Sequence, residues 1–210
     1  MKTNDSKNEM QDQVKTVIGD FGTAPLAGTP IADELPLTDA PETVLAMTLD
    51  AMTGEGGYHD IDTLSNSSWE ERTSVLQKGG YNRYREQCAT NLGGLAELVR
   101  DKYDGDLNNL MRRAHGKREN VRAMMKEIKG IGDLGVELFF DNVQSIWPSI
   151  APFVDSRSLK TADEIGIGTD LDAIYGALRE DPEEMSLLAN GLSAIRLEKR
   201  QSDLQMHHVT

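Results

Sequence analysis

The stretch Ile128-Lys129-Gly130-Ile131-Gly132 decides how we interpret the fold of this chain. It separates two segments in which apolar residues recur at helical spacing. Glycine permits a sharp turn and lets the backbone approach another molecule closely. The pattern therefore predicts a helical hairpin over residues 118–143, with the two glycines at its reversal.

The end of this hairpin has the chemistry of an anion site. Gly132 stands at the start of the second helix, where free backbone N–H groups point outward and the helix dipole favours a negative charge. Lys126 and Lys129 are brought to the same end. A DNA phosphate would suit this arrangement. A tight connection between two helices with no ligand has the same spacing, and that alternative stays open.

The rest of the chain also indicates helices. Almost no segment alternates apolar and polar residues with period two, so we predict the all-α class. Ser68-Trp69-Glu70-Glu71 has the spacing of a capping box at a helix start. Further helices are expected near 39–52, 82–102, 107–113, 155–164, 170–179 and 182–199.

Both ends of the chain lack the pattern of a packed segment. Residues 1–36 are acidic and polar, contain three prolines and show no sustained apolar period, so we expect a disordered tail there. Residues 201–210 are expected to form a second disordered tail. One helical domain is expected over 37–200.

The order of features after the turn resembles the helix-hairpin-helix base-excision DNA glycosylases, the superfamily that includes endonuclease III and the adenine and alkylbase glycosylases. Gly130-Ile131-Gly132 is followed by a helix, a stretch with two prolines, and then Asp155 at the next helix start. Upstream, Gly79-Gly80-Tyr81-Asn82 resembles the Gly-x-Tyr-Asn turn of endonuclease III-like members. The resemblance covers residues 60–200.

This resemblance implies a monofunctional DNA glycosylase that hydrolyses the N-glycosidic bond of a damaged or mismatched base. Asp155 would be the catalytic carboxylate, acting on a base that has left the helical stack. Asp155 also suits the N-cap of its helix, and the two roles are compatible. Arg157 and Lys160 would contact DNA, or they are solvated surface charges.

The chain also departs from the family pattern. Bifunctional relatives place a Schiff-base lysine where this chain has Leu134, so we do not expect lyase chemistry. Asp133 puts a negative charge beside the phosphate position. Cys88 is the only cysteine, so the iron–sulfur segment is absent and no cofactor or metal is expected. The helical region before residue 60 is short, which suggests a truncated first lobe.

Charge is distributed unevenly along the chain. The formal net charge is -13, but residues 61–130 carry 13 basic and 10 acidic side chains. Binding to a phosphate backbone depends on such a local positive surface, so we expect double-stranded DNA as the partner. Two other readings stay open: a catalytically inactive DNA-binding relative that keeps the hairpin, and an acidic helical protein-interaction module.

The sequence has no apolar run of the length of a membrane span, about 20 residues, and no secretory signal. We therefore expect a soluble intracellular monomer, nuclear or cytoplasmic. Trp69 and Trp147 are interpreted as core anchors. Arg83-Tyr84-Arg85 mixes positive charge with an aromatic ring, which can suit nucleic acid, but we interpret it as a helix surface with one packed tyrosine.

Overall fold

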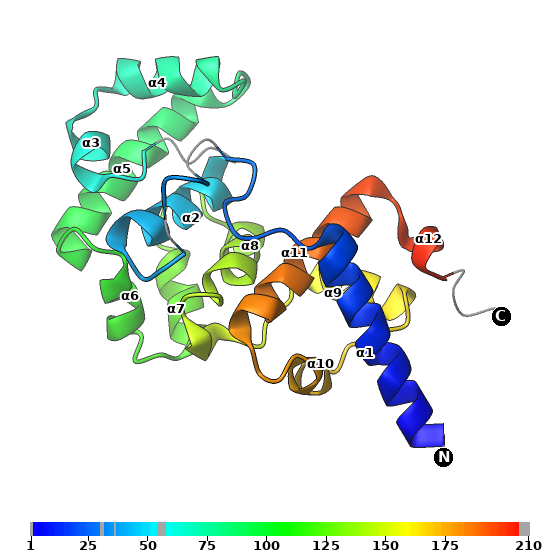
Figure 1. Ribbon diagram of the computed structural model, residues 1–210. Helices are drawn as coiled ribbons and strands as arrows, with labels where there is room; N and C mark the ends of the chain where they lie inside the picture. Colours follow the sequence, from blue (N-terminus) through cyan, green and yellow to red (C-terminus); the bar gives the residue numbers. More distant parts are fainter. Residues whose placement is uncertain (1, 30–31, 36, 54–57, 206–210) are drawn as a thin grey trace. The chain divides into compact units, whose positions relative to one another are not determined.

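The computed structural model describes residues 2–29, 32–35, 37–53 and 58–205. Over these residues it contains α-helices, one short 3₁₀ helix and loops, with no β-strand (Figure 1). The predicted all-α class is confirmed. None of the helices in the described ranges is both long and apolar enough to cross a membrane.

The helices have the following bounds: α1 (Lys2–Phe21), α2 (Pro41–Thr53), α3 (Ile61–Asn66), α4 (Trp69–Lys78), α5 (Arg85–Tyr103), α6 (Asn108–Arg113), α7 (Arg118–Met125), α8 (Asp133–Val143), η1 (Pro148–Ile150), α9 (Ser156–Glu164), α10 (Leu171–Ala177), α11 (Pro182–Glu198) and α12 (Gln201–Gln205).

The chain divides into two compact units. One unit runs from Leu26 to Phe139, and the other combines the residues up to Pro25 with those from Phe140 onward. This division differs from the single domain over 37–200 that we expected. The difference arises because the first segment of the chain packs with the last one.

The unit from Leu26 to Phe139 is organised around α5. Helices α3, α4 and α6 all pack against it. Apolar residues of α5 at helical spacing are buried, with Leu92, Leu95 and Val99 each at most 2% exposed. The capping box before α4 is confirmed: the Ser68 hydroxyl accepts the Glu71 N–H at 3.1 Å, and the Glu71 carboxylate accepts the Ser68 N–H at 2.7 Å.

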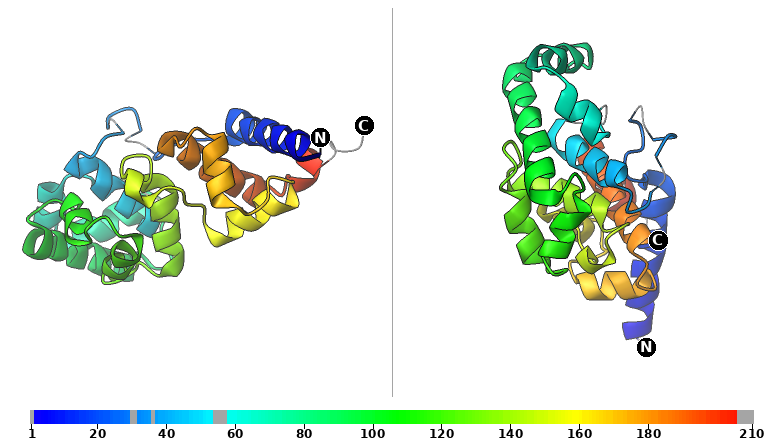
Figure 2. Two further views of the ribbon diagram at one scale, coloured as in Figure 1. Left: turned by 90° about the horizontal axis from the view of Figure 1, so that it is seen from below. Right: turned by 90° about the vertical axis from the view of Figure 1, so that its left-hand side faces the viewer.

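The other unit is built on α1 and α11, which lie side by side (Figures 1 and 2). Figure 2 shows α1, in blue, alongside α11 in both of its views. Val14 and Val17 of α1 are buried in one core with Leu188 and Leu192 of α11. The prediction that residues 1–36 form a disordered tail is therefore wrong for the segment that makes α1.

The physical reason is an apolar stripe on α1. Its partly or fully buried apolar residues recur at spacings of three and four, which places them on one helical face: Met10, Val14, Val17, Ile18 and Phe21. Gly191 of α11 faces this stripe, and a Cβ there would lie 3.0 Å from Val17 Cγ1. The missing side chain lets the two helices approach closely.

The segment after residue 200 also differs from the expected tail. Residues Gln201–Gln205 form α12, in which Leu204 is 4% exposed and belongs to the same core as α1. The Gln13 side-chain amide donates to the Leu204 carbonyl at 3.5 Å. The remainder of the predicted tail, 206–210, lies outside the described residues.

Candidate functional site

The turn between α7 and α8 is tight and depends on a left-handed glycine. Backbone hydrogen bonds close it, with the Ile131 N–H donating to the Ile128 carbonyl at 3.0 Å. Gly130 has φ +97°, which L side chains rarely adopt. A Cβ there would also lie 2.7 Å from Asn91 Nδ2 of α5. The turn itself therefore requires glycine at position 130.

Gly132 is different, because nothing inside the protein requires it. It is exposed, and a Cβ there would meet no atom within 4 Å. Its carbonyl accepts the Val136 N–H at 3.0 Å, which is the first hydrogen bond of α8. The N–H groups of Asp133 and Leu134 precede that bond, as at any helix start, and have no acceptor among the described residues. The backbone here is open to close approach by another molecule.

Among the described residues, the charged side chains at the turn leave one unpaired positive charge at the start of α8. Lys126 Nζ lies 2.8 Å from Asp133 Oδ1, and both side chains are exposed. The hydrogen bond and the positive charge of Lys126 lower the pKa of Asp133 below its ordinary value. Lys126 thus neutralises the acid that stands beside the anion position. Lys129 is exposed and has no ion-pair partner in the described part of the chain.

The apolar residues around the turn divide into two groups. Ile128 and Ile131 are buried, at 1% and 5% exposure, and hold the turn against the unit. Leu134 is 45% exposed, so it does not help to join the two helices. Gly135 of the same helix lies close to the turn and to α2, since a Cβ there would lie 3.3 Å from Ile131 Cγ2 and 3.6 Å from the Ala51 carbonyl.

Asp155 is the N-cap of α9, as the sequence predicted. Its Oδ1 accepts the backbone N–H groups of Arg157 at 2.9 Å and Ser158 at 3.2 Å. The side chain is 0% exposed. The second oxygen, Oδ2, is buried and has no hydrogen-bond partner among the described residues. A buried carboxylate oxygen without a partner costs stability, so such a group calls for a functional explanation.

Two side chains contact Asp155, one at its backbone and one at its carboxyl group. Asp141 Oδ1, from the last turns of α8, accepts the Asp155 backbone N–H at 2.9 Å. Arg157 Nε lies 3.7 Å from Asp155 Oδ1, and the Arg157 side chain is 46% exposed. A partly exposed arginine side chain therefore lies close to the carboxyl oxygen that caps α9. Sequence reasoning missed Asp141, because its bond to the Asp155 backbone joins residues 14 positions apart and no local pattern indicates it.

The predicted site residues fall into two groups. Those of the turn, Lys126, Lys129, Gly130, Ile131 and Gly132, come together at one end of α7 and α8. Asp155 and the exposed residues Arg157 and Lys160 come together on α9, in the other unit. Each group is intact within its own unit.

Trp69 is a residue that the sequence interpretation misplaced. Trp147 is 6% exposed and packs in the interior, as expected of a core anchor. Trp69 is 39% exposed, and its indole Nε1 donates to the Thr90 hydroxyl at 3.1 Å. Helix α4 buries only Leu76 fully, so most of its residues face solvent, including its first one.

These features define the class of the molecule: an all-helical protein with an exposed glycine turn between two helices and a buried, helix-capping carboxylate. No protein-family model, no curated protein and no solved structure matches the chain. Within the described ranges, no three His, Cys, Asp or Glu side chains are grouped so that they could hold a metal ion.

Proposed function

We propose that this chain is a DNA base-excision repair protein of the helix-hairpin-helix glycosylase kind. It holds double-stranded DNA at the turn between α7 and α8 and hydrolyses the N-glycosidic bond of a damaged or mismatched base. The observation that carries the proposal is the exposed turn. At this turn Gly132 leaves the α8 N–H groups open, and Lys129 has no ion-pair partner among the described residues.

DNA binding at this turn follows from general features of phosphate recognition. Helix N-termini and lysines contact phosphate oxygens, and these contacts position a protein without reading sequence. The pairing of Lys126 with Asp133 removes the repulsion that the acid would otherwise exert on a phosphate. The chain as a whole is strongly acidic, so its affinity for DNA depends on this local surface and on low ionic strength.

The chemistry is assigned to Asp155. In the hydrolysis, water oxygen bonds to the anomeric carbon, the bond to the base breaks, and its electron pair leaves with the base, which takes up a proton. A carboxylate can stabilise the positive charge on the sugar or accept a proton from the water. Oδ2 has no hydrogen-bond partner among the described residues, so this oxygen is left for such a role.

A second candidate function is a DNA-binding relative without catalysis. The complete burial of the Asp155 side chain favours it, because a carboxyl group that stays covered serves only to cap α9. This candidate keeps the same turn and the same duplex binding. It differs only in that the base stays attached to the sugar.

A cleavage assay separates these functions. The full chain is incubated with end-labelled duplexes that each carry one damaged or mismatched base, and half of each sample is then treated with hot alkali. We expect strand breaks at one or more modified positions after alkali and none without it, because Leu134 supplies no amine for lyase chemistry. Duplex binding with no break on any substrate would favour the inactive relative. A flat duplex-binding curve at low salt would favour the acidic interaction module and contradict DNA binding altogether.

The two glycines provide a matched test of the turn. Gly132→Ala adds a methyl group into open space, so we expect no loss of thermal stability. If a phosphate approaches this backbone, the same change should weaken duplex affinity by about tenfold, equivalent to about 1.4 kcal/mol. Fluorescence anisotropy with a labelled duplex measures the affinity, and circular dichroism measures the melting.

Gly130→Ala is the comparison for this test. Because Gly130 has a positive φ, alanine there should lower the free energy of unfolding by about 1–3 kcal/mol. Unchanged duplex affinity in Gly132→Ala would show that DNA does not contact this turn. Equal melting curves for the two variants would contradict the turn geometry itself.

A further inference from the structure

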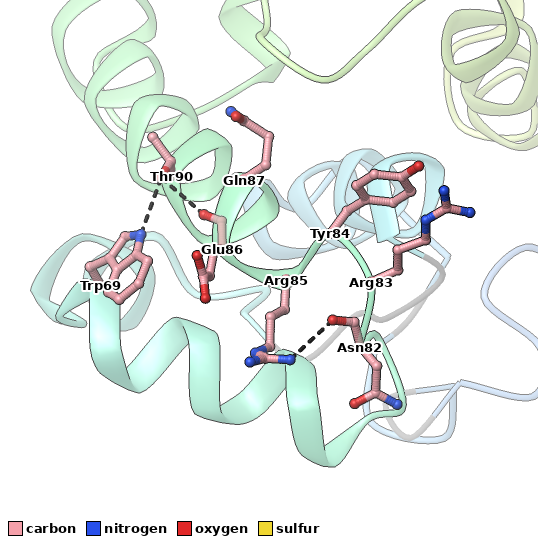
Figure 3. A pocket seen from close by; sticks show the side chains of 8 residues that line it. All are labelled: Trp69, Asn82, Arg83, Tyr84, Arg85, Glu86, Gln87 and Thr90. Atoms are coloured by element: carbon pink, nitrogen blue, oxygen red, sulfur yellow. Dashed lines mark hydrogen bonds between the residues drawn. The ribbon is translucent and has the colours of Figure 1, made fainter.

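A groove of about 520 Å³ lies between the first turn of α4 and the segment that leads into α5 (Figure 3). This volume is in the range of small-molecule sites. All of its lining residues belong to the segment 69–90, within a single unit. The proposed role of the turn between α7 and α8 leaves this groove unexplained.

Two aromatic side chains border the groove and are exposed. Trp69 is 39% exposed and Tyr84 is 58% exposed. The hydrogen bond from Trp69 Nε1 to the Thr90 hydroxyl ties the indole ring to α5 (Figure 3). Exposed aromatic rings at a concave surface are typical of binding sites. Fixed rings also lose little entropy when a flat ligand stacks on them.

The charges of the groove favour an anionic ligand. Arg83 and Arg85 both line it, and neither has an ion-pair partner in the described part of the chain. The Arg83 guanidinium lies 5.1 Å from the centre of the Tyr84 ring, and Arg85 Nη1 donates to the Asn82 carbonyl at 3.1 Å. Glu86 is the one acidic residue in the lining. Aromatic rings combined with arginines are the usual means of binding unpaired nucleotides.

The groove adjoins the turn between α7 and α8. Gln87 lines the groove and donates its side-chain amide to Asn91 Oδ1 at 3.0 Å, one helical turn further along α5. Asn91 Nδ2 in turn lies 2.7 Å from the position of a Cβ on Gly130. Two side chains thus link the groove to the turn. The groove and the turn therefore lie on neighbouring parts of one unit.

We propose that the groove binds unpaired nucleotides of single-stranded DNA, with bases stacked on Trp69 and Tyr84 and phosphates beside Arg83 and Arg85. The continuity with duplex DNA rests on the proposed function of the turn. The affinity of the groove for a single strand does not. The full chain should therefore prefer a duplex with an unpaired overhang to a blunt duplex.

Tryptophan fluorescence tests the groove directly. The full chain is titrated with an oligothymidylate of eight nucleotides, and tryptophan emission is followed. Of the two tryptophans, Trp147 is buried and Trp69 is exposed, so stacking of a base should quench Trp69. The quenching should disappear in Trp69→Phe. Tyr84→Ser should weaken binding of the oligonucleotide by about tenfold, which lies within the range for the loss of one stacking ring.

Controls separate this inference from the proposed function. Leu197→Ser alters a more exposed apolar residue outside the groove and should leave the titration unchanged. Blunt-duplex affinity, measured in parallel, should not change in Tyr84→Ser. Quenching without any duplex binding would contradict the proposed function and leave the groove assignment standing. An absence of quenching, or a titration that Tyr84→Ser does not alter, would overturn the groove assignment whatever the duplex does.

Discussion

Replacing Asp155 with asparagine should lower the rate of base excision by about 10²- to 10⁴-fold, the usual contribution of a positioned acid or base. An amide cannot accept a proton from water, and it cannot balance the positive charge on the sugar. It can still cap α9, because asparagine and aspartate are equally good N-caps. The variant thus removes the chemistry and keeps the local structure.

The same substitution, Asp155→Asn, should not lower the free energy of unfolding, although it lowers the rate of excision. The Asp155 carboxyl group is buried, and its Oδ2 has no hydrogen-bond partner among the described residues. Burial of such a group is costly, and asparagine removes the charge. We therefore expect the free energy of unfolding of Asp155→Asn to equal or exceed that of the unmodified chain. Asp155→Ala, which also loses the cap, should be less stable by about 1 kcal/mol.

Asp170→Asn is the matched control for this result. Asp170 caps α10 in the same way, since its Oδ1 accepts the N–H groups of Asp172 and Ala173 at 3.1 Å each. It is exposed and should have no part in the chemistry. Single-turnover excision followed by alkali gives the rates. If Asp155→Asn and Asp170→Asn excise equally fast, the carboxylate of Asp155 is not the reacting group.

The features that the sequence predicted well depend on neighbouring residues. The capping box at Ser68 and the Asp155 cap are read within four residues of sequence, and both have the expected hydrogen bonds. Helix α8 follows directly on Gly132 and ends at Val143, in agreement with the hairpin predicted over 118–143. Helix α7 ends at Met125, because residues 126–128 already form the turn.

The features that were missed depend on distant residues. The burial of the α1 stripe requires α11, more than 160 residues away, where Gly191 permits the close approach. The sequence interpretation found no sustained apolar period in residues 1–36, because the stripe is short and lies among acidic and polar residues. The burial of the Asp155 side chain also depends on tertiary packing, which no local sequence pattern indicates. The exposure of Trp69 likewise depends on how little of α4 is packed.

Helix α1 also carries the largest expected effect on stability. Val17 is 0% exposed and belongs to the core formed with α11. A carboxylate in its place would be buried in an apolar interior. Burial of an unpaired charge, or the proton uptake that avoids it, is among the most destabilising single changes known. We therefore expect Val17→Asp to lower the free energy of unfolding by at least about 4 kcal/mol.

Urea unfolding followed by circular dichroism measures this loss, and Gly19→Ala is the control on the same helix. Gly19 is exposed, and a Cβ there would meet nothing within 4 Å. Alanine should therefore stabilise the helix by about 0.5–1 kcal/mol, because it loses less backbone freedom than glycine on folding. In a disordered tail neither substitution would have a measurable effect. A Val17→Asp protein as stable as the unmodified chain would therefore restore the tail interpretation and remove α1 from the core.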